Sequence, residues 1–245
     1  MKLVVAGSTG FVAGEVIRQA LSNPQISSIV AFGRRVAAPV PVPTNAAPGA
    51  DADATKLKSI VCDDFMNYPD SLKQELAGAD ACIWSIAVTP AQLKTVPWET
   101  TVAVCRDFAV KGIQQISEQT NKKPFRFVYI SGHNAVRDPA QKPMILGDYC
   151  VLRGEAENQI LEFAQQSNGA VEVLIAKPGI ISGPGHETPM FQKVFFSVIG
   201  LPKIRVSHIS ATLIDQVING FDQGDTLLND DMVRLGDKIL VAEKR

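Results

Sequence analysis

A serine, a tyrosine and an arginine near the middle of the chain could together perform acid–base chemistry on a carbonyl or an alcohol. Tyr149 and Arg153 are four positions apart, so on one helix their side chains face the same way. The cation favours the phenolate, and we expect it to lower the pKa of Tyr149 from about 10. Ser131 would bind the same substrate oxygen from across a cleft. Tyr149 would then protonate a carbonyl that receives hydride, or deprotonate an alcohol that loses it.

The same residues have a purely structural interpretation, in which Tyr149 is an ordinary helix residue and Ser131 caps a strand. Other catalytic arrangements find less support. His133, His186 and His208 are far apart and lack metal-ligand spacing, so no metal site is predicted. Ser131 is not in a Gly-x-Ser-x-Gly turn, which argues against a hydrolase.

A glycine-containing turn near the N-terminus indicates a dinucleotide site. Residues 3–6 read as a buried strand, and a helix running to about Leu21 follows. Gly7 permits the tight turn between them, and Gly10 lets the backbone approach a pyrophosphate at the helix start. The third small position is Ala13 or Gly14. The residues that we expect to contact the cofactor here are Gly7, Thr9, Gly10, Phe11 and Val12.

A glycine turn of this kind can also be structural and bind nothing, but its place between a strand and a helix favours the cofactor. The next strand, 28–33, ends at Gly33 and is followed by Arg34 and Arg35. In a dinucleotide-binding sheet this position faces the adenosine ribose, where an acid would select NAD. A guanidinium suits a 2′-phosphate, so the sequence predicts NADP. The alternative is a solvated basic pair at the start of a loop.

Later strand ends supply further candidate cofactor contacts. An acid after the third strand can meet the adenine amino group or simply begin a turn, and the end of the fourth strand would pass under the nicotinamide ribose. The sixth strand closes on Lys-Pro-Gly. These candidates are Asp63, Asp64, Ser85, Ile86, Ala87, Lys177, Pro178 and Gly179.

Strands and helices alternate along the chain and predict a doubly wound α/β fold. The predicted strands are 3–6, 28–33, 58–62, 79–87, 125–131 and 171–177, and the helices between them include 70–76, 97–120 and 148–166. Right-handed crossovers give a parallel, Rossmann-like sheet of order 3-2-1-4-5-6. In the helix 148–166 we count Glu155, Glu157 and Glu162 among the polar positions. Ligands should bind where the first and fourth strands diverge.

The remaining segments are less regular. Residues 36–55 are rich in Pro and Ala and predict a mobile surface loop. Helices are expected at 189–200 and 209–221 and an extended piece at 204–206. We expect one domain over 1–245, with a substrate-side extension within 179–245.

Composition limits the possible partners. The chain has 245 residues and a net charge of -1, which offers no general attraction for nucleic acid or anionic lipid. Neither a targeting signal nor a membrane-length apolar run is present, so we expect a cytoplasmic protein, monomeric or homodimeric, that binds a small molecule. Four scattered cysteines, Cys62, Cys82, Cys105 and Cys150, are expected to be reduced and buried.

Four stretches resemble the short-chain dehydrogenase/reductase superfamily, in its divergent (atypical or extended) branch of NAD(P)-binding proteins. They are 7–13, 129–131, 149–157 and 177–184, and the style is closest to the Tat-interacting-protein-like oxidoreductases. The resemblance implies that Ser131 and Tyr149 polarise the substrate oxygen. It also implies a lysine four residues after the tyrosine, which binds the nicotinamide ribose and relays protons.

Arg153 stands where the family has this lysine. It keeps the positive charge but cannot release a proton near neutral pH. The leading hypothesis is an NADP-dependent oxidoreductase that acts on a small or medium hydrophobic carbonyl or alcohol. Two alternatives stay open: a dinucleotide-binding regulatory protein without turnover, and a non-redox isomerase, cyclase or lyase that uses Tyr149 as acid or base.

Overall fold

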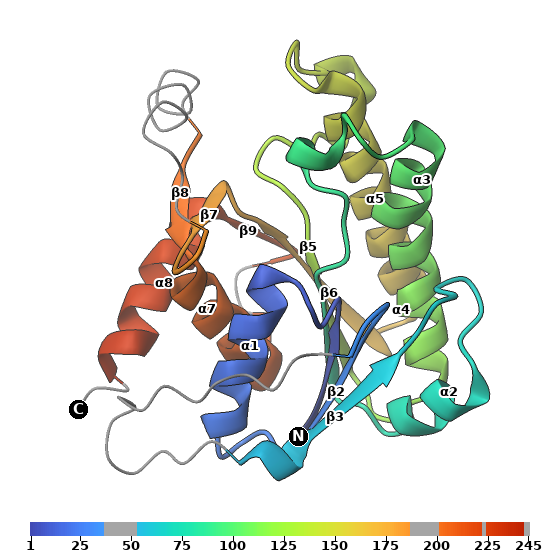
Figure 1. Cartoon of the computed structure of the whole chain (residues 1–245), viewed down its shortest axis with the longest axis vertical. Coiled ribbons are helices and arrows are strands. Elements are labelled where there is room, and N and C mark those ends of the chain that lie inside the picture. Colours follow the sequence, from blue (N-terminus) through green and yellow to red (C-terminus); the bar gives the residue numbers. More distant parts are fainter. Residues whose placement is uncertain (37–52, 187–200, 222–223, 243–245) are drawn as a thin grey trace.

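The computed structural model describes residues 1–36, 53–186, 201–221 and 224–242. Most of the loop predicted at 36–55 and the helix predicted at 189–200 lie outside the described residues. Within the described residues, seven parallel strands form one sheet of order β3-β2-β1-β4-β5-β6-β9 (Figure 1). The strands are β1 (Lys2–Ala6), β2 (Ser28–Gly33), β3 (Leu57–Val61), β4 (Ala81–Trp84), β5 (Phe125–Ile130), β6 (Val171–Lys177) and β9 (Thr226–Leu228).

This topology confirms the predicted order 3-2-1-4-5-6 and adds β9 beside β6. Most of the first six strands are recognisable in sequence because burial on both faces requires mainly apolar runs, whereas β3, at the edge of the sheet, is only partly buried and contains Lys58 and Ser59. The final strand, β9, has only three residues and pairs with β6. A segment this short carries too little pattern to be found from sequence.

Helices cover both faces of the sheet (Figure 1). They are α1 (Phe11–Ser22), α2 (Asp70–Leu76), α3 (Trp98–Val102), α4 (Phe108–Glu118), α5 (Gly147–Gln166), α7 (Val206–Asn219) and α8 (Asn229–Ala242). The buried residues of α1 and α7 share one apolar cluster with β1 and β4, and those of α2, α4 and α5 share another on the opposite face. After β1 the chain crosses to β2 on one side, and after β4 it crosses to β5 on the other side. The two connections therefore diverge, which opens the carboxyl edge of the sheet between β1 and β4.

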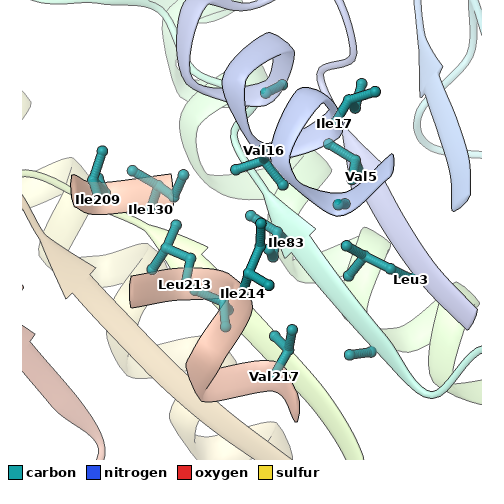
Figure 2. Packing of buried hydrophobic residues seen from close by; sticks show 14 of the residues in the cluster. Leu3, Val5, Val16, Ile17, Ile83, Ile130, Ile209, Leu213, Ile214 and Val217 are labelled. Carbon is teal, nitrogen blue, oxygen red and sulfur yellow. The ribbon is translucent and has the colours of Figure 1, made fainter. Parts of the chain in front are cut away.

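The first of these clusters holds α7 against the sheet. Figure 2 shows Leu213, Ile214 and Val217 of α7 directed toward Val16 and Ile83, which belong to α1 and β4. Leu213 and Val217 are fully buried. Part of the segment 179–245 thus packs into the main core.

The helix predicted at 97–120 is interrupted by a wider, π-helical turn at Ala103–Asp107, between α3 and α4. This turn changes the backbone hydrogen-bonding partners, and the carbonyl of Cys105 accepts a hydrogen bond from the Tyr129 hydroxyl at 2.8 Å. All four cysteines are buried and unpaired, as predicted. A small parallel pair, β7 (Ile180–Ser182) with β8 (Lys203–Arg205), lies beside α7 and α8.

Candidate functional site

The turn after β1 requires the glycine at position 7. Gly7 has φ +90°, and a Cβ there would lie 2.6 Å from the Ser85 hydroxyl oxygen. The amide groups of Gly7 and Ser8 both donate to the carbonyl of Phe32, at 2.9 and 3.2 Å, which ties the turn to β2. The Gly10 amide donates to the Gly7 carbonyl at 2.8 Å. The turn is therefore tightly built and sits where β1, β2 and β4 end.

The beginning of α1 has the properties of an anion site. Ala13 is fully buried and Gly14 has open space around its Cα, so Ala13 is the small residue packed between helix and strand. The amide of Gly14 is the first to bond within the helix, to Gly10, so the preceding first-turn amides have no intrahelical acceptor. The first turn contains no acidic residue. Thr9 and Gly10 are exposed at this helix start. These residues fit the pyrophosphate of a dinucleotide.

At the adenosine end, Arg34 and Arg35 are exposed and directly follow β2. A Cβ on Gly33 would lie 3.1 Å from the Ser8 hydroxyl oxygen, so this strand end adjoins the glycine turn. Asp63 is exposed, whereas Asp64 accepts hydrogen bonds from the Met66 and Asn67 amides at 2.8 and 3.1 Å. These bonds lower the pKa of Asp64. Asp64 therefore shapes the turn after β3, the alternative left open above.

The end of β4 forms the floor of the glycine turn. The amide and the hydroxyl of Ser85 both donate to the Ala6 carbonyl, at 3.0 and 2.8 Å. Ile86 is half-buried, and its side chain would lie 3.1 Å from a Cβ on Gly7. Ala87 packs with Val88 in an apolar cluster. All three predicted contacts therefore lie at the carboxyl edge, next to the turn.

Tyr149 and Arg153 lie together on α5 but differ in accessibility. The Tyr149 hydroxyl donates to the Val88 carbonyl at 2.8 Å, in the loop that follows β4. Arg153 is only 2% exposed, and its Cζ lies 4.8 Å from the centre of the Tyr129 ring. One terminal nitrogen of Arg153 donates to the Ile130 carbonyl, and the other, Nη1, is buried and has no hydrogen-bond partner among the described residues. Arg153 thus supports the site from within the core.

The expected lowering of the Tyr149 pKa is wrong. Burial raises this pKa to about 12, and the opposing effect of the Arg153 charge is smaller. The four-residue spacing correctly places the Arg153 cation near Tyr149, but it does not show how deeply the phenol is buried. Tyr149 therefore keeps its proton throughout the neutral range.

Ser131, at the end of β5, donates its hydroxyl hydrogen to the carboxylate of Glu157 at 2.5 Å. Glu157 is fully buried and also contacts Arg137 at 2.8 Å and Lys177 at 3.2 Å. The Lys177 ammonium donates to the Ala135 carbonyl at 2.6 Å as well. Ser131 can therefore accept a further hydrogen bond but has already committed its donor. The carboxylate also fixes Lys177, one of the predicted cofactor contacts.

Neither Glu157 nor Arg137 is among the site residues that the sequence predicts. The sequence predicts Glu157 only as a polar position of its helix, whereas in the structure it is completely buried. A signal was present, because Tyr149, Arg153 and Glu157 are spaced by four and share one helix face. Arg137 comes from the loop between β5 and α5, and nothing in the sequence predicted its position.

The last two predicted contacts serve the connection to β7. The Pro178 carbonyl accepts a hydrogen bond from the His133 amide at 2.8 Å. The Gly179 amide donates to the Asn229 side chain at 3.0 Å, and a Cβ on Gly179 would lie 2.1 Å from the Pro202 carbonyl oxygen. The backbone at Gly179 therefore passes so close to the Pro202 carbonyl that only glycine fits there.

In the described parts of the chain, no group of three or more His, Cys, Asp or Glu side chains could hold a metal ion. None of the helices in those parts is long and apolar enough to cross a membrane.

Solved structures share this fold. MoeE5 in complex with UDP-glucuronic acid and NAD superposes with a TM-score of 0.68 at 18% identity, over 94% of this chain and 76% of MoeE5. Vestitone reductase from alfalfa (Medicago sativa L.) has a TM-score of 0.64 at 21% identity, over 93% of this chain and 76% of the reductase. DesIV, a dTDP-glucose 4,6-dehydratase from Streptomyces venezuelae, has a TM-score of 0.66 at 14% identity, over 100% of this chain and 81% of DesIV.

These similarities establish the fold and nothing more, because all three sequence identities are low. No protein-family model matches the chain, and no curated protein matches its sequence.

Proposed function

We propose that this chain is an NADP-dependent oxidoreductase of the short-chain dehydrogenase/reductase type, acting on a small or medium hydrophobic carbonyl or alcohol. The observation that carries the proposal is the glycine turn, packed against Ser85 at the edge where β1 and β4 diverge. MoeE5 and DesIV, which share the fold, have both been solved with NAD. The preference for NADP rests on Arg34 and Arg35 at the end of β2.

The surroundings of Tyr149 support an apolar substrate. Tyr149 packs against an apolar cluster built from the loop after β4, the π-helical turn and α5. Its members are Ala87, Val88, Leu93, Val96, Val102, Val104, Cys105 and Leu152. A hydrophobic group next to the reacting carbon would extend this cluster and gain the free energy of leaving water. Selectivity for polar groups of the substrate would come from the few side-chain hydroxyls at the carboxyl edge of the sheet.

The roles of the chain's own residues follow from their hydrogen bonds. A bound nicotinamide would supply or accept the hydride. Tyr149 would exchange its bond to the Val88 carbonyl for one to the substrate oxygen and donate its proton there. Arg153 would stabilise negative charge developing on the tyrosine oxygen. Ser131, whose hydrogen is held by Glu157, would accept a hydrogen bond from a substrate hydroxyl.

Cofactor preference provides the first test. NADPH is expected to bind about tenfold or more tightly than NADH, because a charge-assisted hydrogen bond contributes roughly 1.5–3 kcal/mol. The double variant Arg34→Ala/Arg35→Ala should bind both equally, with its NADH affinity unchanged. Isothermal titration of each dinucleotide measures the difference.

The matched control is Lys122→Ala/Lys123→Ala, which removes an exposed basic pair that precedes β5. It should leave the ratio of the two affinities intact. Equal affinities in the unmodified protein would refute the choice of NADP, and absence of binding to either dinucleotide would refute the proposal itself.

The raised pKa of Tyr149 predicts an asymmetry between reduction and oxidation. Carbonyl reduction needs the protonated phenol, which persists up to about pH 12, so its rate should show no Tyr149 limb between pH 6 and 10. Alcohol oxidation needs the phenolate, whose fraction rises tenfold per pH unit below the pKa. Oxidation should therefore accelerate about tenfold per pH unit in this range. Initial rates in both directions test this, and an oxidation plateau near pH 7 would contradict it.

A dinucleotide-binding protein without turnover is the second candidate. The observation in its favour is that the hydroxyl hydrogens of Tyr149 and Ser131 are both held by protein acceptors, Val88 and Glu157. Arg153 is also buried rather than extended toward the cofactor edge. The two candidates differ in the outcome of the Tyr149 substitution considered below.

A further inference from the structure

An aromatic stack stands at the first residue of α1. The ring of His186 lies 4.0 Å from the ring of Phe11, with an interplanar angle of 14°. His186 is exposed, and Phe11 is partly buried. The stack joins the glycine turn to the segment that follows β7, two parts of the chain that are far apart in sequence.

The position of His186 is fixed by its own short turn. Its amide donates to the Gly183 carbonyl at 3.0 Å, and the two residues form an antiparallel bridge. A Cβ on Gly183 would lie 2.9 Å from the Phe11 ring and 2.6 Å from the Val206 side chain. The turn is therefore seated on the first residues of α1 and α7, and His186 is held against the start of α1.

The start of α1 is also where the pyrophosphate would bind. Side chains of a helix lean toward its N-terminus, so the Phe11 ring and the imidazole stacked on it are directed toward the first turn, whose amides have no intrahelical acceptor. The nearest acid along the helix, Glu15, is bonded to Arg18 at 2.7 Å, which neutralises its charge. An imidazole N–H beside these amides would add a side-chain donor for a phosphate oxygen.

We infer that His186 is a ligand of the cofactor's pyrophosphate and closes the outer side of the dinucleotide site. The inference rests on the proposed function, since it requires a bound dinucleotide. It assigns to residues 183–186 a binding role that the glycine turn alone does not provide.

The test replaces the donor while keeping the stack. His186→Phe retains an aromatic ring against Phe11 but has no N–H, and it should bind NADPH about tenfold more weakly than the unmodified protein. His186→Gln restores a donor and should recover part of the affinity. Adenosine 2′-monophosphate contains no pyrophosphate, so it should bind the unmodified protein and His186→Phe equally well. His208→Gln, which changes a histidine bonded to Asp237, is the control and should leave NADPH affinity unchanged.

The outcomes separate this inference from the proposed function. Equal NADPH affinity in His186→Phe and the unmodified protein overturns the inference alone. Equal losses for NADPH and adenosine 2′-monophosphate would identify a distorted turn and also overturn it. If the unmodified protein binds neither NADPH nor NADH, both the proposed function and this role fall.

Discussion

Replacement of Tyr149 by phenylalanine should lower turnover about 10²–10⁴-fold, the usual contribution of a general acid or base. The ring keeps its contacts with the apolar cluster around Val88, and only the hydroxyl is lost. NADPH affinity should therefore change by no more than a few-fold. Steady-state rates with a panel of hydrophobic ketones and alcohols give the first quantity, and a binding titration gives the second.

Two variants control this experiment. Tyr68→Phe removes the hydroxyl of another buried tyrosine, which belongs to a different apolar cluster and whose hydroxyl has no hydrogen-bond partner in the part of the chain that the structure describes. It should leave turnover unchanged. Arg153→Lys keeps a cation next to Tyr149 and restores the lysine of the family, so an oxidoreductase should keep or gain activity. If the protein binds NADPH but shows no hydride transfer that depends on the Tyr149 hydroxyl, a binding protein without turnover replaces the oxidoreductase as the proposed function.

Glu157→Gln should reduce the free energy of unfolding by about 3–5 kcal/mol, because it leaves a buried cation without its partner. Lys177 is the more affected cation, since its side chain is 12% exposed whereas that of Arg137 is 32% exposed. The carboxylate also joins α5 to the end of β6 and to the loop after β5, so three segments lose a common contact. Urea unfolding followed by circular dichroism measures the change.

Glu162→Gln is the matched control, because this exposed glutamate lies on the same helix and accepts a hydrogen bond from the Gln166 side chain at 3.1 Å. Its effect should stay within about 0.5 kcal/mol. Adding Lys177→Met to Glu157→Gln should recover part of the loss, since the uncompensated charge is then removed. Equal stabilities of Glu157→Gln and Glu162→Gln would show that the buried carboxylate does not stabilise the fold.

Local sequence patterns were sufficient to predict the order of six strands and the position of the glycine turn. Both depend on local patterns: continuous apolar runs for buried parallel strands, and glycines where the backbone must turn sharply. The handedness of the crossovers then leaves few topologies, which is why 3-2-1-4-5-6 could be predicted. The placement of Ser85 and Tyr149 at the carboxyl edge followed from their positions after the end of a strand and near the start of a helix.

The hydrogen bonds and the burial of the side chains at that edge depend instead on long-range packing. The pKa of Tyr149 depends on how completely the loop after β4 excludes water, and Ser131 lost its free hydrogen to a glutamate 26 residues away. Contacts such as Arg137 with Glu157 and Phe11 with His186 join segments whose meeting depends on the packing of the whole chain. Local patterns report the backbone's preferences, whereas burial and hydrogen-bond partners arise from long-range packing. The roles of these side chains were therefore fixed only when the chain folded.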